Sequence, residues 1–500
     1  MDFLDPKKSR AHQIRLIVGY VLIGVALVLA TRVLVYQANG FGLDKEGDVI
    51  QNGLVFVSST PGSADIYIND QRKDTTNTRL TLQAGTYKLR LTRDGYRDWQ
   101  RAVTVEGAGL ERIYYPFLIP KDLSNKELTS YSTKPGMSTE SPDRRWLVVK
   151  KPGSLADFDM YDIKDAKKAQ SLKSSFSVPA GVFTAAASSE GESLKTLEWS
   201  NDNIHFVVQH NYDGKIEYVL VSRKDPAQSV NLSQKLAMVA GQVVTLQDKK
   251  YDKYFVHNPV LQTLATASLD APGQVKLLDN VLAYKTYGTD EVLFVSKQGA
   301  AAGKVAVKLL HDGKTYTVRT LAEAASYSLQ LSRYNDSWFV TAGSSSENKT
   351  YIYKDPATVL QRKDKTLIPV AVLKLTSPTY AAISANSQYI LGESGTDFAV
   401  YDIENDRSHV YHIDKPLDAP QLHADWMDGN RITYVSAGGV VIFDFDGTNV
   451  QSLVPATADQ PVIFDTGYTA IYSLSPAKAA TAATGQYSLN AAWLRTPRDQ

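Results

Sequence analysis

The sequence predicts a mainly β protein: a single N-terminal transmembrane helix, a small β-sandwich and then a seven- or eight-bladed β-propeller. An uncharged apolar run covers residues 16–31, and short strands separated by Gly and Pro turns fill residues 53–120. From residue 125 onward, a turn-and-strand unit recurs at intervals of roughly 40 to 55 residues. We expect a tail at 1–15, a helix at 16–36, a spacer at 37–52, the sandwich at 53–120 and the propeller at 125–500.

The apolar run has the length of a membrane span. Sixteen residues at about 1.5 Å each give about 24 Å, and continuing to Tyr36 gives about 31 Å, close to the ~30 Å hydrocarbon core of a bilayer. Arg32 falls near one end, where its long side chain can reach the headgroups. The run therefore predicts a single-pass anchor.

Charges on either side of the run predict its orientation. Four basic residues precede it: Lys7, Lys8, Arg10 and Arg15. After Arg32 the next charged residue is Asp44. Because cationic flanks stay in the cytoplasm, we expect the N-terminus inside and the bulk of the chain extracytoplasmic, in the cell membrane. The alternative is a signal peptide cleaved after Ala30, but the apolar pattern resumes beyond Arg32 and favours an uncleaved anchor.

Composition excludes several function classes. The chain is 43 % hydrophobic, and its 500 residues imply two or more structural units or one large β architecture. Lys+Arg number 54 against 53 Asp+Glu, and the cluster at residues 249–253 contains acidic residues, so we expect no nucleic-acid partner. The chain has no cysteine, which excludes disulfides, thiol catalysis and cysteine-based zinc sites.

Residues 53–120 carry a recognisable pattern of turns. Ser59-Thr60-Pro61-Gly62-Ser63 precedes an alternating strand at 64–68, a second strand occupies 86–91, and Asp94-Gly95-Tyr96 follows it. Glycine permits the tight turns, and Tyr96 can pack back over the sheet. These residues resemble a PEGA domain, although Asp74 to Thr78 replace the usual Gly-x-Thr-Pro turn. The resemblance implies an extracytoplasmic, non-catalytic module of prokaryotic envelope proteins, acting as a spacer or as a ligand-binding domain.

The larger region contains repeated units. Most follow one plan: a turn, a buried strand, a loop, and a strand that ends in an aromatic residue and an aspartate. The clearer copies begin near residues 141, 199, 331, 383 and 426, and weaker ones span 241–267, 281–310 and 461–493. The unit resembles the repeats of TolB-like and WD40-like propellers, whose blade turn often reads Ser-Pro-Asp-Gly, as in Ser141-Pro142-Asp143. A pair of stacked sandwiches is the structural alternative.

Known catalytic motifs are missing from the sequence. It has no Gly-x-Ser-x-Gly or His-Glu-x-x-His, and Gly313-Lys314-Thr315 lacks the upstream glycine of a phosphate loop. His409 and His412 would lie on opposite faces of a strand, which disfavours a shared metal. We therefore predict no catalytic, cofactor-binding or metal-binding residues, and no cofactor.

Three weaker features remain open. Asp157, Asp159 and Asp162 would place carboxylates near a channel or in solvated turns. The segment 444–447 resembles part of a calcium loop but also fits a hairpin. The tryptophans at 146, 199, 338 and 426 suit core packing better than a stacking platform.

These features favour a membrane-anchored, non-catalytic binding or scaffold protein of the cell envelope, with a protein or cell-wall polymer as partner. The alternative is a propeller-based hydrolase or lyase that acts on carbohydrate or peptide through channel carboxylates. A signal receptor is disfavoured, since the 15 residues before the helix are too few for a cytoplasmic output domain.

Overall fold

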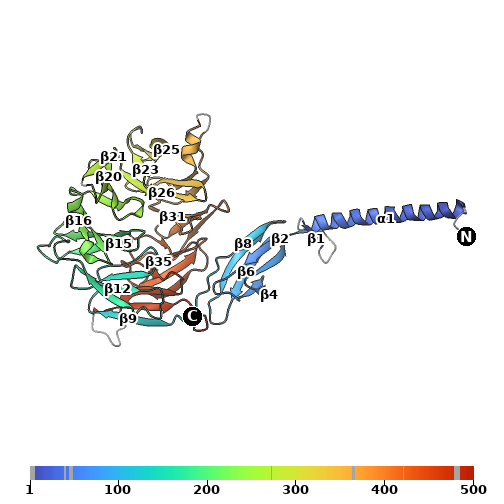
Figure 1. Cartoon of the computed structure of the whole chain (residues 1–500), viewed down its shortest axis with the longest axis horizontal. Coiled ribbons are helices and arrows are strands. Elements are labelled where there is room, and N and C mark those ends of the chain that lie inside the picture. Colours follow the sequence, from blue (N-terminus) through green and yellow to red (C-terminus); the bar gives the residue numbers. More distant parts are fainter. Residues whose placement is uncertain are drawn as a thin grey trace. The chain divides into compact units, whose positions relative to one another are not determined.

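The computed structural model describes residues 6–38, 41–43, 49–271, 273–362, 366–419, 422–477 and 485–499 (Figure 1). The chain divides into two compact units, with the boundary between Asp122 and Leu123. The first unit contains an N-terminal helix and a β-sandwich, and the second contains a β-propeller.

The helix α1 spans Pro6–Ala38 and begins ten residues before the predicted start at residue 16. Residues 7–15 contain no glycine or proline, so nothing in the basic flank interrupts the helix. The stretch His12–Tyr36 has 25 residues, a mean hydropathy of 2.3 and no buried portion. It is long and apolar enough to cross a membrane.

Two four-stranded sheets form the predicted sandwich. One sheet contains β1 (Phe41–Leu43), β2 (Val49–Val57), β5 (Thr78–Gln83) and β8 (Leu110–Ile113). The other contains β4 (Gln71–Thr75), β3 (Asp65–Ile68), β6 (Gly85–Thr92) and β7 (Trp99–Val105). Alternate residues of β2, β3 and β6 face a shared core, among them Val55, Ile66 and Leu91. Tyr96 is 1 % exposed and packs into this core as expected.

The turn that departs from the usual pattern is stabilised by a threonine. Thr76 Oγ1 accepts a hydrogen bond from the Ala64 backbone N–H at 2.9 Å and lies 2.8 Å from Ser59 Oγ. The next residue, Asn77, has a φ of 71°, a conformation that asparagine tolerates better than most residues. Buried hydrogen bonds thus take the place of the Gly-Pro turn.

The second unit is a propeller of eight four-stranded antiparallel blades in the described part of the chain. Its first four blades contain β10 (Ser138–Glu140), β11 (Trp146–Lys150), β12 (Asp157–Asp162) and β13 (Lys173–Ser177); β14 (Ser193–Trp199), β15 (His205–Tyr212), β16 (Lys215–Ser222) and β17 (Val230–Asn231); β18 (Val243–Leu246), β19 (Lys253–Asn258), β20 (Thr263–Ser268) and β21 (Gln274–Leu278); and β22 (Ala283–Tyr287), β23 (Glu291–Ser296), β24 (Lys304–His311) and β25 (Lys314–Ala322).

The last four blades follow the same order. They contain β26 (Tyr327–Tyr334), β27 (Ser337–Ser344), β28 (Lys349–Lys354) and β29 (Ala371–Lys374); β30 (Tyr380–Ile383), β31 (Tyr389–Ser394), β32 (Asp397–Asp402) and β33 (Arg407–His412); β34 (Asp425–Trp426), β35 (Arg431–Ser436), β36 (Gly439–Asp444) and β37 (Gln451–Pro455); and β38 (Ile463–Phe464), β39 (Ala470–Pro476), β40 (Tyr487–Trp493) and β9 (Asn125–Tyr131). Short helices α2 (Leu232–Lys235) and α3 (Pro356–Leu360) lie between strands.

The blades form a ring, which excludes the alternative of two stacked sandwiches. First strands of neighbouring blades contact one another, as β26 does with β22 and β30, and the sheets follow each other around the propeller in Figure 1. The eighth blade closes the ring, because its outer strand β9 comes from the start of the unit and pairs with β40 near the end. The blade count is at the upper end of the predicted range.

Continuous apolar strands occur because both faces of a blade are covered. On β15, Phe206 and Val208 pack toward the first blade, whereas Val207 packs toward the third. A two-sided hydrophobic strand of this kind is typical of a central strand buried on both faces. The sequence copies near 141 and 383 share one turn: the serine hydroxyl of Ser141 or Ser384 accepts the backbone N–H five residues later, at 3.0 and 2.9 Å.

Candidate functional site

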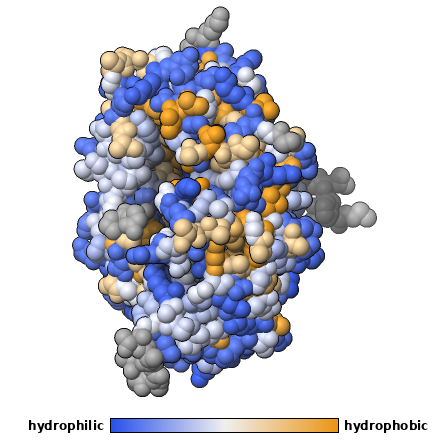
Figure 2. All heavy atoms as spheres, turned by 90° about the vertical axis from the view of Figure 1, so that its left-hand side faces the viewer, coloured by the Kyte–Doolittle hydropathy of each residue, from blue (hydrophilic) through white to orange (hydrophobic). Residues whose placement is uncertain are grey.

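A cavity of about 580 Å³ lies among the first strands of blades one, two, seven and eight. It is bordered by β10, β14, β34 and β38 and by the connections that lead into them. The side of the propeller drawn in Figure 2 is hollowed near its middle, where hydrophilic and hydrophobic residues both border the hollow. The volume is in the range of small-molecule sites in proteins.

Glu140, Asp425 and Arg144 are three of the charged residues that line this cavity. Glu140 is the last residue of β10 and Asp425 is the first of β34. On the second strands of their blades, Glu140 pairs with Leu147 and Asp425 pairs with Thr433. Arg144 belongs to the turn that follows β10.

The protein surroundings disfavour ionisation of both carboxyl groups. Burial raises the pKa of Glu140 to about 8; Arg144 acts against this rise, and the charge of Asp425 adds to it. Burial also raises the pKa of Asp425, against a backbone hydrogen bond and the charge of Arg144. The Asp425 side chain nevertheless keeps an exposed surface, since water inside the cavity can reach it although protein surrounds it.

Several polar atoms of the cavity lining lack a partner. Arg144 Nη2 donates to the Met427 carbonyl at 2.8 Å, and its guanidinium carbon lies 4.6 Å from the Tyr468 ring centroid. Within the described ranges, four buried atoms of the lining have no hydrogen-bond partner: Arg144 Nη1, Trp426 Nε1, Glu140 Oε2 and Thr196 Oγ1. Because buried polar groups are normally satisfied, these four atoms mark the lining as chemically incomplete.

His423 also borders the cavity. Its Nδ1 lies 2.9 Å from Glu393 Oε1, and its ring stacks on Tyr380 with centroids 4.1 Å apart and planes 3° apart. Glu393 is 2 % exposed and also accepts the Ala424 backbone N–H at 2.7 Å. These contacts fix the orientation of the imidazole.

The three aspartates considered from the sequence lie elsewhere. Asp157, Asp159 and Asp162 lie on β12, the third strand of the first blade, and not on a first strand. Asp159 is 2 % exposed and pairs with Lys173 at 2.9 Å; Asp162 pairs with Arg145 at 2.7 Å. They are ion-pair and hydrogen-bond groups of the blade.

The structure also locates the calcium-loop-like segment and the four tryptophans considered from the sequence. Segment 444–447 begins at the end of β36 and forms the turn toward β37, where Asp446 accepts a hydrogen bond from the Thr448 hydroxyl at 2.6 Å. Trp199 and Trp426 line the cavity and are each 7 % exposed. Trp146 instead contacts Arg223, whose guanidinium carbon lies 4.1 Å from its ring centroid. Trp338 packs against Tyr287.

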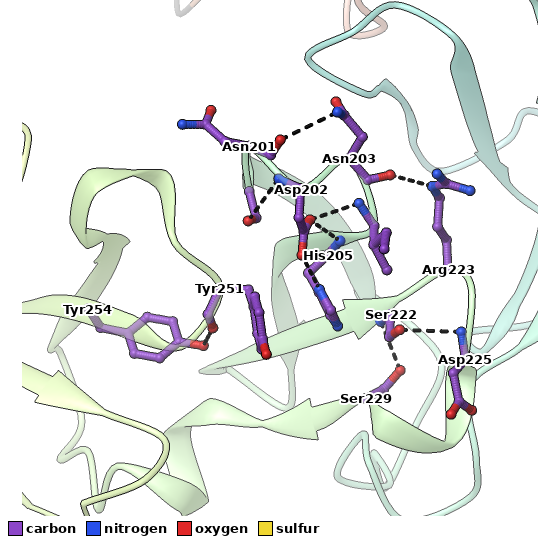
Figure 3. Close-up of polar contacts among 12 residues, drawn as sticks. Asn201, Asp202, Asn203, His205, Ser222, Arg223, Asp225, Ser229, Tyr251 and Tyr254 are labelled. Atoms are coloured by element: carbon purple, nitrogen blue, oxygen red, sulfur yellow. Dashed lines mark hydrogen bonds and ion pairs between the residues drawn. The ribbon is translucent and has the colours of Figure 1, made fainter.

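Figure 3 shows a second polar cluster, in the first turn of blade two. Asp202 Oδ1 accepts the backbone N–H of His205 at 3.0 Å, and Asp202 Oδ2 lies 2.6 Å from His205 Nδ1. The His205 ring stacks on Tyr251 at 4.2 Å. Ser222 is paired with His205 across the strands, but it is 1 % exposed and its hydroxyl accepts the Asp225 N–H at 3.4 Å. The cluster stabilises the turn.

Among the described residues, one group has ligand atoms placed close enough for a metal ion. In Glu291, His311 and Asp312 these atoms all lie within 4.8 Å of one another. His311 Nδ1 is 2.7 Å from Glu291 Oε2, so these two side chains already satisfy each other. Both lie in the fourth blade, and neither borders the central cavity.

Sequence reasoning missed Glu140, Arg144 and Asp425. The last residue of the first strand before the turn is Trp199, Ile383, Trp426 and Phe464 in four of the repeats, but it is Glu140 in the first. An ionisable residue at a position that is apolar in the other copies is a signal that the sequence does contain. For Asp425 we find no comparable signal.

Comparison with known proteins identifies only part of the chain. Residues 52–114 match the PEGA domain, which confirms the resemblance seen in the sequence. No curated protein matches the chain.

Solved structures that resemble the chain include the uncharacterized protein lmo1340 from Listeria monocytogenes EGD-e (TM-score 0.38, 11 % identity, 68 % of this chain and 93 % of that chain). An oligogalacturonate lyase in complex with manganese (0.36, 10 %, 73 % and 98 %) and the Cps50 (Swd1) beta-propeller domain of Myceliophteria thermophila (0.35, 11 %, 66 % and 100 %) are also similar. These scores are too low to carry a conclusion about function.

Proposed function

We propose that this protein is a membrane-anchored, extracytoplasmic binding protein of the cell envelope, which uses the central cavity of its propeller to bind a ligand on a protein or cell-wall polymer. The observation that carries the proposal is the incomplete polar lining around Glu140, Arg144 and Asp425. A rigid eight-bladed ring holds these groups in fixed positions, which lowers the entropic cost of binding.

Two further observations support the location. The stretch His12–Tyr36 is long and apolar enough to cross a membrane and has basic residues on its N-terminal side, and the PEGA match at 52–114 agrees with an envelope protein. The cysteine-free composition suits an oxidising exterior.

The test uses the full chain in detergent. Envelope extracts are passed over the immobilised protein, and captured polymer and protein are compared between the unmodified chain and Asp425→Asn. Glu190→Gln, at an exposed carboxylate in the connection between blades one and two, is the control. Capture that is lost in Asp425→Asn and retained in Glu190→Gln supports the proposal; capture that is equal in all three, or absent in all three, contradicts it.

A hydrolase or lyase acting on carbohydrate is the second candidate, because the cavity does bring two carboxyl groups together. Glu140, with a pKa of about 8, would be the protonated acid, and Asp425 the base. Release of reducing ends from wall polysaccharide by the unmodified chain, abolished in Glu140→Gln, would favour the enzyme over the binding protein.

A further inference from the structure

Resting on the proposed function, we propose that the chemical group bound in the central cavity is a primary ammonium, carried on a polar body and held by Asp425 and Glu140. The argument begins from the charges inside the cavity. Two carboxyl groups, Glu140 and Asp425, are close enough to Arg144 for its charge to act on both. When both carboxyl groups are ionised, Glu140, Asp425 and Arg144 together have a net charge of minus one.

The other charged residues of the lining do not supply the missing charge. Glu198 already accepts the Leu246 N–H and the Lys249 ammonium, and Asp459 pairs with Lys134. His423 holds Glu393 through Nδ1. Lys195, on β14, has an exposed side chain, and no contact between it and either Glu140 or Asp425 occurs in the described residues. The lining therefore has room for one added cation beside Asp425 and Glu140.

The accessibility of the three side chains also favours an ammonium as the bound group. Arg144 is engaged by the Met427 carbonyl and the Tyr468 ring, so its positive charge is held in the wall. Asp425 is the member of the three with the exposed side chain, and the Glu140 side chain is partly accessible although Oε2 is buried. A ligand entering the cavity thus meets carboxylate oxygens, the acceptors that an ammonium prefers.

Binding of a cation has a proton consequence that binding of a neutral group lacks. In the free protein near pH 7, Glu140 holds its proton, because its pKa is about 8. When the ammonium binds, the Glu140 O–H bond breaks, the proton passes to solvent and the carboxylate pairs with the ligand. Up to one proton is released per ligand bound, and no other covalent bond changes.

The test measures binding to the full chain in detergent by isothermal titration calorimetry, with two matched pairs of probes. One pair is Nα-acetyl-lysine amide and its Nε-acetylated form; the other is glucosamine and N-acetylglucosamine. Within each pair the amine probe keeps the charge and its acetylated partner lacks it. Preference within the lysine pair indicates a protein source, and preference within the sugar pair indicates an amino-sugar source.

We expect at least tenfold tighter binding of one amine than of its acetylated partner, and at least tenfold loss of that binding in Asp425→Asn. For the lysine probe, whose amine stays charged, the Kd should rise about 25-fold from pH 8.5 to 6.5, since the proton of Glu140, with its pKa of about 8, must then be displaced. Glu140→Gln should abolish this pH dependence. Glu190→Gln should leave both the Kd and the pH dependence unchanged.

Equal binding of the charged and acetylated probes, or amine binding that Asp425→Asn does not weaken, would overturn the inference. So would failure of both amines to bind while the same protein still captures an envelope partner through Asp425; that result leaves the proposed function intact. If the unmodified protein is folded, as verified by circular dichroism, but neither captures an envelope partner nor binds a probe, both the proposed function and the ammonium inference are contradicted.

Discussion

His210 Nδ1 lies 2.8 Å from Glu217 Oε1, in a contact from which solvent is excluded. The other ring nitrogen of His210 is 3.1 Å from Glu192 Oε1, so the imidazole lies between two carboxylates. Glu217 also accepts hydrogen bonds from the Thr184 hydroxyl at 2.6 Å and from Asn231 Nδ2 at 2.8 Å. Burial opposes ionisation of Glu217, but these hydrogen bonds outweigh it and lower its pKa to about 2.

The first prediction is that Glu217 makes the propeller sensitive to acid. A carboxyl group with a lowered folded-state pKa stabilises the fold above its unfolded value near 4.5, and this contribution is lost as the pH falls toward 2. Glu217→Gln should lower the free energy of unfolding at pH 7 by about 2–4 kcal/mol, because His210 loses a buried partner. It should also flatten the decline of the propeller melting temperature between pH 5 and pH 2.

Glu190→Gln is the control for that change, since its side chain is exposed in the connection that leads into the same blade. Thermal melts followed by circular dichroism at several pH values give the comparison. A Glu217→Gln protein that declines with acid as steeply as the unmodified chain would contradict the assignment.

The second prediction concerns the unusual turn in the PEGA domain. Thr76→Val keeps the side-chain shape but removes the hydroxyl that accepts the Ala64 N–H and contacts Ser59. Leaving these buried groups unsatisfied should destabilise the domain by about 1–3 kcal/mol. Hydrogen exchange at the Ala64 amide should then be faster, whereas Thr81→Val, at an exposed strand position, should leave it unchanged.

The third prediction tests closure of the propeller ring. Leu128 on β9 is 4 % exposed and packs with Leu474, Leu489 and other residues of the closing blade. Leu128→Ala should cost about 2–5 kcal/mol through lost burial and a cavity. In urea unfolding, the propeller transition should move to lower urea. Leu261→Ala, at a side chain that is 70 % exposed, should not move it.

The fourth prediction concerns topology, and the cysteine-free sequence makes the experiment clean. Single cysteines are introduced by Ser9→Cys before the apolar run and by Ser189→Cys in the propeller. In intact cells a membrane-impermeant maleimide should label the second and not the first, because basic flanks remain cytoplasmic. Labelling of both only after lysis would place the propeller inside the cell.

The same experiment separates the anchor from the alternative of cleavage after Ala30. An uncleaved chain keeps the Ser9→Cys label after lysis at the full molecular mass. A labelled fragment that ends at Ala30, or a propeller released into the medium, would indicate processing.

Periodicity predicted the fold well because it is repeated along the chain. The turn beginning at Ser141 recurs at Ser384 with the same backbone hydrogen bonds, so several copies support one interpretation. Helical structure also extends beyond the predicted membrane segment. Apolar residues define the segment that suits a membrane, but helical structure continues through the basic flank to Pro6, where hydrophobicity gives no signal.

The candidate site was not predicted, because it depends on contacts between distant parts of the sequence. Glu140 and Asp425 are separated by most of the propeller and meet because the ring closes. The aspartates considered from sequence, such as Asp159, were chosen for their local density. The structure shows that Asp159 instead forms an ion pair with Lys173 within the first blade.

The eighth blade has a consequence for how the chain must fold as it emerges. Strand β9 precedes all the other propeller strands in the sequence, yet its partner β40 is complete only at Trp493. Until then β9 has an unpaired edge, which is a site for wrong pairing with other chains. A nascent or exported chain therefore cannot complete its propeller gradually from one end. Truncation before β40 should leave an aggregation-prone, protease-sensitive intermediate and not a smaller propeller.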